Sequence, residues 1–312
     1  MREGVQAWYL EGIDYTLAPT SLAALRAQAR HTLASRSELV ATEKWEHLFQ
    51  GKRGALAAGW VFLEELVATM RGIATGSNGF FLISKNDVAR TKIRPSQILP
   101  CVGRAKDVRH FVFTERDFHD LTGAGGKTQL LNLRDPLTVA ERAYVDQGEA
   151  SGLLARYLLK TRFPWYSMEQ RNVAPVWAAV FGRGDLKFVY NEAGVRSLTN
   201  FHCVYPHNRD PQFMRALVFC LNSTTVRAHS KLHTRIYGGG LSKFEPKDVK
   251  AIPVPDLRRV SRERLAELSR SLDDMDTLSR RGQQTERAAR WDELVQAAGR
   301  DAAKSRSVFQ RL

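Results

Sequence analysis

Two short stretches of this sequence carry side chains suited to binding a polyanion. The first, residues 71–81, reads RGIATGSNGFF, and the second, residues 162–166, reads RFPWY. Arginine neutralises phosphates, while amide and hydroxyl groups form hydrogen bonds with phosphates or with base edges. These residue types therefore favour a binding surface over a catalytic centre.

Other combinations that could do chemistry are incomplete. His229 and His233 have the spacing of two metal ligands on one helix face, but no HExxH glutamate lies between them. Residues 116–120 (RDFHD) place carboxylates around a histidine, in a pattern that indicates a helix or turn. Residues 122–128 (TGAGGKT) look like a nucleotide-binding loop, but the Walker pattern requires glycine where Leu121 stands. We therefore predict no catalytic, metal or cofactor site in this chain.

The composition indicates a folded and strongly basic protein. Its 312 residues include 47 Lys+Arg and 33 Asp+Glu, a formal net charge of +14, and 43% of them are hydrophobic. Such a charge attracts polyanions, so nucleic acid is the expected partner, although scattered surface charge would give the same composition. Cys101, Cys203 and Cys220 show no CxxC spacing, and no apolar stretch is long enough to span a bilayer. We expect a cytoplasmic protein that does not bind a membrane.

Hydrophobic periodicity divides the chain into three parts. Residues 1–54 indicate a helical connecting segment, with one helix over residues 21–35 and a second that starts near Ser37. Residues 55–257 mix strand-like and helix-like runs, and residues 258–312 carry apolar side chains at helical spacing among many charges. The predicted fold class is α+β: a mixed β-sheet domain with flanking helices and a C-terminal helical tail.

Within the central part, the first polar stretch lies between two expected strands. One strand ends at Gly72, residues 74–79 turn, and a second strand covers residues 80–83. Glycines in the turn allow the backbone to approach a ligand closely. Three further strand-like runs and one helix are expected at residues 176–181, 187–190, 201–205 and 213–221.

The two polar stretches belong to an ordered set of short motifs. The other members are FVYN at 188–191, LNS at 221–223, GGG at 238–240 and IPVP at 252–255. Together they resemble the target-recognition domain of adenine-N6 DNA methyltransferases of the TaqI type, which belong to restriction-modification systems. The resemblance implies that residues 55–257 read the sequence of duplex DNA.

Two motifs that such an enzyme needs for methyl transfer are missing. The nearest match to an S-adenosylmethionine loop, AVFGRG at 179–184, lacks its acidic partner, and no Pro-Pro dipeptide exists to form the Asn/Asp-Pro-Pro-Tyr/Phe motif that holds a flipped adenine. We therefore expect S-adenosylmethionine to bind a partner catalytic subunit or domain, and this chain to be inactive alone.

A split subunit, a truncated product and an isolated domain would all fit this pattern. The alternatives are a specificity subunit of the type I restriction kind and, from a different class, an RNA-binding or nuclease protein.

In the resemblance, cationic side chains would contact phosphates and polar side chains would read base edges. The predicted DNA-binding residues are Arg71, Thr75, Asn78, Arg104, Arg162, Trp165, Tyr166, Arg171, Arg235, Gly239 and Lys243. Trp165 and Tyr166 could instead belong to the core, and the glycines at 238–240 could form only a tight turn. Replacing Arg162 by alanine is predicted to weaken DNA binding and to lower its salt dependence.

Overall fold

The structure, a computed structural model, describes residues 4–9, 30–35, 56–182, 186–231, 235–237, 241–283 and 286–309. The chain divides into two compact units, Met1–Leu56 and Ala57–Leu312. In the first unit, strands β1 (Gly4–Tyr9) and β2 (Arg30–Ser35) pair antiparallel.

The helix predicted over residues 21–35 is wrong for residues 30–35. These residues pair with β1, and this pairing overrides their helical periodicity. Residues 21–29, and the second helix predicted in the 1–54 segment, lie outside the described residues.

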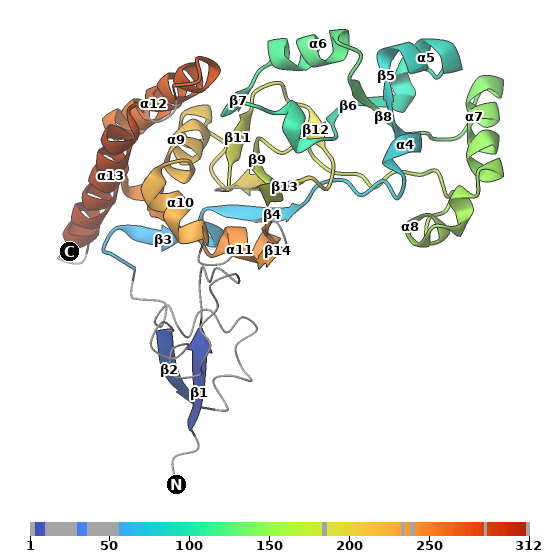
Figure 1. The fold of residues 1–312 in the computed structure, drawn as a ribbon. Coiled ribbons are helices and arrows are strands. Elements are labelled where there is room, and N and C mark those ends of the chain that lie inside the picture. The colour runs from blue at the N-terminus through green and yellow to red at the C-terminus, as the bar shows by residue number, and fades with distance from the viewer. Residues whose placement is uncertain are drawn as a thin grey trace. The chain divides into compact units, whose positions relative to one another are not determined.

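The second unit is built on a five-stranded sheet with the order β4-β13-β9-β11-β7 (Figure 1). The strands are β4 (Val67–Arg71), β7 (Val112–Phe113), β9 (Val176–Ala179), β11 (Phe188–Asn191) and β13 (Phe201–Pro206). Only the β11–β7 pair of this sheet is parallel. The α+β fold class and the strands predicted at 187–190 and 201–205 are confirmed, whereas the run at 176–181 forms β9 only as far as Ala179.

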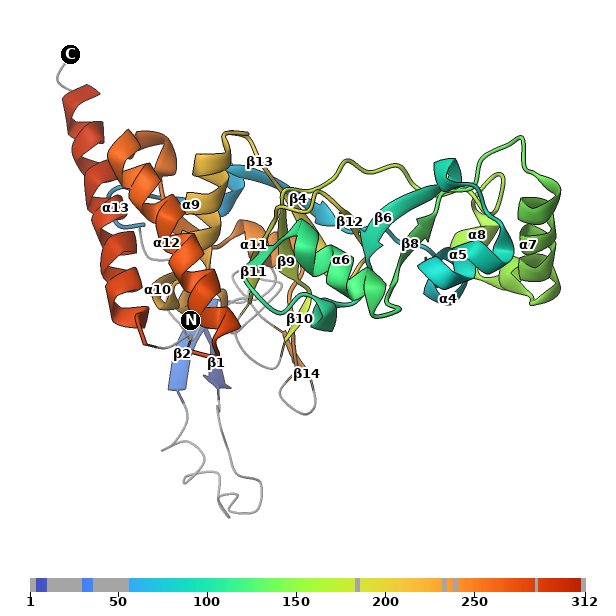
Figure 2. The same ribbon diagram turned by 90° about the horizontal axis from the view of Figure 1, so that it is seen from above.

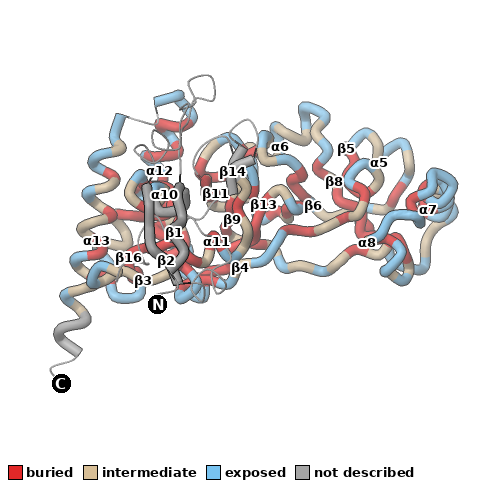
Figure 3. Tube along the Cα trace, turned by 60° about the horizontal axis from the view of Figure 1, so that its bottom comes forward, coloured by how far each residue is buried: buried red, intermediate tan, exposed pale blue. Residues whose placement is uncertain are grey.

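Both faces of this sheet are buried along its central strands β9, β11 and β13, as Figure 3 shows. On β9, Val176 and Ala178 belong to one hydrophobic cluster and Trp177 to another. Successive side chains of a strand point to opposite faces, so each cluster covers one face. This two-sided burial explains the continuous apolar runs in the sequence.

Helices build the larger of these two clusters. They are α9 (Pro211–Leu221), α10 (Thr224–Lys231), α11 (Pro246–Lys250), α12 (Arg262–Arg280) and α13 (Ala288–Phe309). Helices α9 and α12 pack side by side (Figure 2), and Leu272 of α12, Trp291 of α13 and Leu217 of α9 share one core. The predicted helix at residues 213–221 and the helical tail are therefore present, and the tail packs on its own unit.

A second sheet carries the other half of the unit. Its four strands have the order β12-β6-β8-β5: β5 (Leu82–Ser84), β6 (Ile98–Val102), β8 (Lys127–Leu131) and β12 (Arg196–Ser197). Its helices are α4 (Asn78–Phe81), α5 (Lys85–Thr91), α6 (Glu115–Gly123), α7 (Val139–Ala150) and α8 (Tyr157–Lys160). Capping boxes begin α5, α6 and α7, which explains why these helices start where they do.

The strand predicted over residues 80–83 is wrong at its first half. Phe80 and Phe81 end helix α4, because their amides donate to the carbonyl oxygen of Ser77 at 3.1 and 3.0 Å. The strand begins only at Leu82. Four large apolar residues in a row do not distinguish a strand from a buried helical turn.

Short strands complete the described fold. Strand β3 (Trp60–Phe62) pairs with β16 (Pro253–Pro255), and β15 (Leu241–Lys243) pairs with β10 (Phe181–Gly182) and β14 (Arg235–Tyr237). Among the helices within the described ranges, none combines the length and hydropathy that a bilayer crossing requires.

Asp276 joins α12 to the edge of the five-stranded sheet. Its carboxylate is buried and accepts hydrogen bonds from the backbone amides of Phe111 and Val112 at 2.8 and 2.7 Å. Its second oxygen accepts from Nε of Arg280 at 2.6 Å. Arg280 in turn pairs with Asp117 on α6 at 2.8 Å, so one chain of contacts ties the tail to the sheet and to α6.

Replacing Asp276 by alanine is expected to lower the free energy of unfolding by about 3 kcal/mol, since two backbone amides lose their acceptor and Arg280 loses a partner. The control is Asp274→Ala on the same helix, whose carboxylate is 60% exposed and meets Arg287 at 3.4 Å. Surface pairs of this kind contribute at most about 1 kcal/mol. Urea denaturation followed by circular dichroism measures both, and equal losses would contradict the assigned role of Asp276.

Candidate nucleic-acid interface

The first polar stretch crosses from the five-stranded sheet to the four-stranded sheet. Strand β4 ends at Arg71, and α4 then leads into β5. Gly72 lies against the backbone of Leu198, where a Cβ atom would fall 2.2 Å from the Leu198 carbonyl oxygen. Gly76 has a φ of +79° and lies over the side chain of Leu159. Glycine is therefore required at both positions of this segment, which we call the 71–79 loop.

The carboxylate of Glu169 holds the beginning of the 71–79 loop. Its Oε1 accepts a hydrogen bond from the amide of Ala74 at 2.8 Å and one from Nε of Arg171 at 3.1 Å. Its Oε2 lies 3.4 Å from the guanidinium of Arg71. Burial raises the pKa of Glu169, but the Ala74 hydrogen bond and the nearby arginines outweigh this effect and hold the pKa below its ordinary value. Glu169 is therefore an anionic anchor for the loop.

Arginine side chains bind the backbone carbonyls that follow. Arg162 donates to the carbonyl oxygen of Thr75 at 3.0 Å and to that of Ala74, and Arg156 donates to that of Gly76 at 3.1 Å. These hydrogen bonds join the two polar stretches singled out in the sequence. The second stretch therefore supports the first.

Side chains within the loop also bind one another. The hydroxyl of Thr75 donates to Oδ1 of Asn78 and accepts a hydrogen bond from the amide of Ser77 at 3.1 Å. Thr75 is buried, and Ser77 lies at the start of α4. Thr75, Asn78 and Arg162 thus help to build the loop, and their contact with DNA stays a prediction.

Trp165 and Tyr166 lie in the core, the alternative that the sequence left open. They are only 8% and 4% exposed. The indole Nε1 of Trp165 donates to Glu149 at 2.8 Å, and its ring lies 5.4 Å from that of Phe80. The hydroxyl of Tyr166 donates to Asp135 at 2.9 Å. Neither ring is available to stack on a base in this structure.

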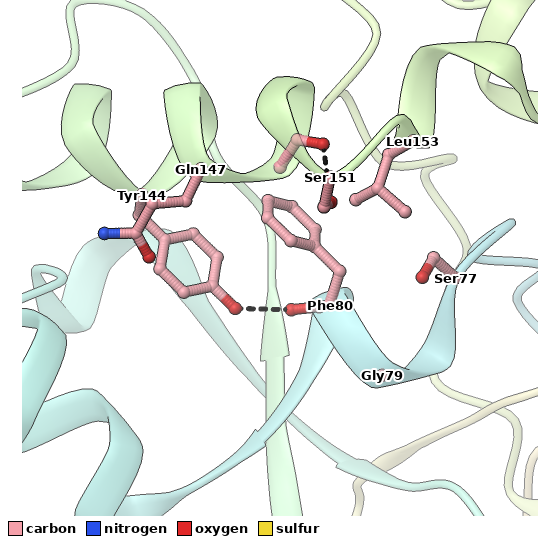
Figure 4. A pocket seen from close by; sticks show the side chains of 8 residues that line it. Ser77, Gly79, Phe80, Tyr144, Gln147, Ser151 and Leu153 are labelled. Carbon is pink, nitrogen blue, oxygen red and sulfur yellow. Dashed lines mark hydrogen bonds between the residues drawn. The ribbon is translucent and has the colours of Figure 1, made fainter.

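An open pocket of about 310 Å³ lies beside the loop (Figure 4). The rings of Phe80 and Tyr144 are 4.7 Å apart, and the Tyr144 hydroxyl donates to the Phe80 carbonyl oxygen at 2.8 Å. Polar groups from α7 and from the start of α4 share the pocket with these rings. The lining residues are Ser77, Gly79, Phe80, Tyr144, Gln147, Gly148, Ser151 and Leu153.

The remaining predicted residues lie on other elements. Arg104 precedes the residues 105–107 turn and pairs with Asp107 at 2.8 Å. Arg235 and Lys243 stand opposite each other in the β14–β15 pair, and Gly239 lies outside the described residues. The structure therefore brings together Arg71, Thr75, Asn78, Arg162 and Arg171 around one loop, whereas Arg104, Arg235 and Lys243 belong to separate elements.

Sequence reasoning missed Glu169 and Arg156, which complete the support of the loop. Glu169 lies 95 residues from Ala74, and Arg156 lies 80 residues from Gly76. No local spacing marks such contacts. The only signal was the absence of other carboxylates between Glu149 and Glu169, which leaves Glu169 as the nearby partner for the arginines.

Two of the chemical candidates in the sequence lie at least partly within the described residues. The described residues contain no group of three or more His, Cys, Asp or Glu side chains able to hold a metal ion. Residues 122–128 end α6, turn and begin β8, so a strand follows the glycines in place of the helix that a P-loop requires. His233 lies outside the described residues.

Comparison with known proteins identifies the family. Residues 56–295 match the family described as the C-terminal domain of the type II methyltransferase M.Eco57I. The chain belongs to this family of methyltransferase C-terminal domains. The resemblance drawn from the ordered motifs is thereby confirmed.

Two curated relatives are type II methyltransferases. The chain is 33% identical over 215 residues to M.AccI of Acinetobacter calcoaceticus, covering 68% of this chain and 40% of the relative. It is 26% identical over 247 residues to M.XamI of Xanthomonas campestris pv. amaranthicola, covering 76% and 44%. The chain thus spans less than half the length of the curated relatives it matches.

Two solved structures show a weaker similarity. One is the type IIG restriction endonuclease BpuSI, with a TM-score of 0.47 and 11% identity over 90% of this chain and 36% of that one. The other is the type IIL restriction-modification enzyme MmeI in complex with DNA, with a TM-score of 0.42 and 12% identity over 77% of this chain and 32% of that one.

Replacing Glu169 by glutamine is expected to speed hydrogen exchange at the Ala74 amide about fivefold to tenfold, since a hydrogen bond to a charged acceptor is stronger than one to a neutral amide. In the wild type, a depressed pKa means that this protection is complete above the ordinary glutamate pKa of 4.5 and is lost as the pH falls through the lower folded value. The glutamine variant should lack that acid-dependent loss.

The control for Glu169→Gln is Glu192→Gln, which changes a carboxylate that is 47% exposed and meets Arg215 at 3.5 Å. This control should leave exchange at Ala74 unchanged. Equal exchange at Ala74 in the wild type and in Glu169→Gln would show that Glu169 does not hold the loop.

Proposed function

We propose that this chain is the sequence-reading part of a site-specific adenine-N6 DNA methyltransferase in a restriction-modification system. Its partner is duplex DNA. The observation that carries the proposal is the match of residues 56–295 to the C-terminal domain of a type II methyltransferase. The names of the relatives support the same class, since M.AccI and M.XamI are both type II methyltransferases.

Charge and the organised loop support a DNA-binding role. The net charge of +14 supplies the attraction to phosphates that dominates protein–DNA affinity. Arg71 projects from the end of β4 with 47% of its side chain exposed, next to a loop whose backbone carbonyls are already bound by arginines. A loop ordered in advance loses less conformational entropy when DNA binds.

Methyl transfer requires groups that these 312 residues do not supply. The sequence has neither a complete S-adenosylmethionine loop nor the Pro-Pro motif that holds the target adenine. In the proposal, a catalytic subunit or domain binds S-adenosylmethionine and performs the transfer, while this chain positions it on cytoplasmic DNA. The type I specificity subunit remains the alternative within DNA binding.

The proposal is tested first by binding-site selection. The purified chain is incubated with a pool of random duplex DNA, and bound molecules are sequenced; enrichment of one short sequence is expected. Duplex RNA of matched length is the control for an RNA-binding protein. Enrichment of no sequence, or a preference for RNA, would overturn the reading role.

Methyl transfer is then measured from labelled S-adenosylmethionine to the selected duplex, by this chain alone and with a methyltransferase catalytic subunit encoded beside it. Transfer only with that subunit is expected. Transfer by the chain alone would contradict the proposed division of labour.

Arg71→Ala is expected to reduce DNA affinity. It should also lower the slope of log affinity against log salt by the amount that corresponds to the loss of about one phosphate contact.

Arg162→Ala should also reduce affinity, but with little change in this slope, because its donors bind loop carbonyls. From the sequence alone, Arg162→Ala was predicted to lower the salt dependence of binding; the contacts of Arg162 in the structure change that expectation to a nearly unchanged salt dependence.

The control for both arginine variants is Arg287→Ala. Arg287 directly precedes α13. Helix α13 lies on the other side of the five-stranded sheet from α4 (Figure 1 and Figure 2). Titrations at several salt concentrations by fluorescence anisotropy measure all three slopes. An unchanged slope for Arg71→Ala would remove Arg71 from the phosphate contacts.

A further inference from the structure

Residues 152–168 form a segment that combines cations with aromatic rings. It contains Arg156, Lys160 and Arg162 and has no aspartate or glutamate. The 3-10 helix at Leu153–Ala155 and helix α8 lie within it. Arg156 and Lys160 are exposed. We call it the 152–168 segment.

The aromatic rings of this segment divide sharply by exposure. Phe163 is 100% exposed and Tyr157 is 84% exposed, whereas Trp165 is 8% exposed. Single exposed apolar side chains are common on protein surfaces. Two nearly fully exposed rings, six residues apart in a segment with three cations and no carboxylate, form a more specific pattern. A protein partner with an ordinary mixed surface would not require that charge bias, whereas DNA supplies both stacked bases and phosphates.

The backbone that carries Phe163 is held on both sides. On one side, the Arg162 amide donates to the Leu159 carbonyl oxygen at 3.2 Å, and its guanidinium binds the 71–79 loop. On the other side, the Ser167 amide donates to the Pro164 carbonyl oxygen at 2.9 Å, and the Trp165 indole is bound by Glu149. The Phe163 ring therefore projects from a fixed turn beside the loop.

We propose that Phe163 inserts between neighbouring base pairs of duplex DNA as an apolar wedge, with Tyr157 as a second stacking ring. Lys160, which is exposed and follows Tyr157 by three residues, neutralises an adjacent phosphate. Apolar wedges of this kind unstack a base step and bend the duplex, and a fixed wedge loses little entropy on insertion. This inference rests on the proposed function and adds the way in which the duplex is deformed.

The experiment uses the full chain and a duplex of the selected sequence in which 2-aminopurine replaces one adenine at a time. Unstacking raises the fluorescence of 2-aminopurine, so the wild type should give increased fluorescence at one step. Phe163→Ala should abolish that increase and weaken binding about tenfold, with an unchanged salt slope. Phe163→Leu, which keeps an apolar wedge, should retain most of the affinity.

Two variants serve as matched controls. Lys160→Ala should lower the slope of log affinity against log salt by the amount expected for the loss of about one phosphate contact, and it should leave the 2-aminopurine signal unchanged. Val139→Ala changes another apolar side chain that is 90% exposed and should alter neither quantity. Thermal unfolding verifies that each variant is folded. Because Phe163 is fully exposed, its substitutions are expected to leave the unfolding temperature unchanged.

The outcomes separate this inference from the proposed function. If the wild type selects no DNA sequence, the proposed function fails and the wedge fails with it. If the wild type binds its selected duplex and Phe163→Ala matches it in affinity and 2-aminopurine signal, the wedge is wrong and the reading role stands. Loss of association with the catalytic subunit, with DNA binding intact, would likewise overturn the wedge by placing Phe163 at a protein contact.

Discussion

The arrangement of the candidate interface depends on the carboxylate of Glu169. Arg71 at the end of β4 and the amide of Ala74, three residues further on, contact this group, and Arg171 reaches it from a segment outside the strands and helices. Without an anion here, several guanidinium groups would face one another across the start of the loop. The carboxylate offsets that repulsion and at the same time satisfies a backbone amide, so one group fixes both the charge and the geometry of the loop.

The loop also connects two differently built sheets. Gly72 approaches the backbone of Leu198 so closely that no larger residue fits, and Ile73 forms a bridge with Leu198. Residues on either side then belong to different hydrophobic clusters, with Val67 in one and Phe81 in the other. The predicted reading surface thus begins where two cores meet, held by backbone contacts as well as by side chains.

Sequence patterns predicted the elements better than the contacts between them. Runs such as 201–205 were recognised as strands because β-branched and aromatic residues favour a buried sheet, and the helical tail was recognised from its apolar spacing. Phe80 and Phe81 were assigned to a strand because a run of consecutive apolar residues shows neither the helical nor the strand periodicity that would distinguish the two structures. The pairing of residues 30–35 with β1 was missed because the apolar spacing within 21–35 does not show which segment those residues pair with.

The site was predicted in part for the same reason. The two polar stretches were singled out together in the sequence, and the structure adds that Thr75 and Arg162 bind groups of the protein; their contact with DNA stays a prediction. Hydrogen bonds between residues 80 to 95 positions apart in the sequence decide which side chains remain free to contact DNA. No local motif encodes these long-range hydrogen bonds.

The arginine contacts to the loop reach peptide oxygens, which every amino acid possesses. Arg156 and Arg162 bind the carbonyl groups of residues 74, 75 and 76, so the identity of the side chains at 74 and 75 does not affect those acceptors. The side chain at 74 can therefore change while the same backbone path is kept, whereas the hydroxyl of Thr75 is itself part of the loop. In the proposed reading role, a new side chain at 74 would be displayed by a framework that does not have to be rebuilt.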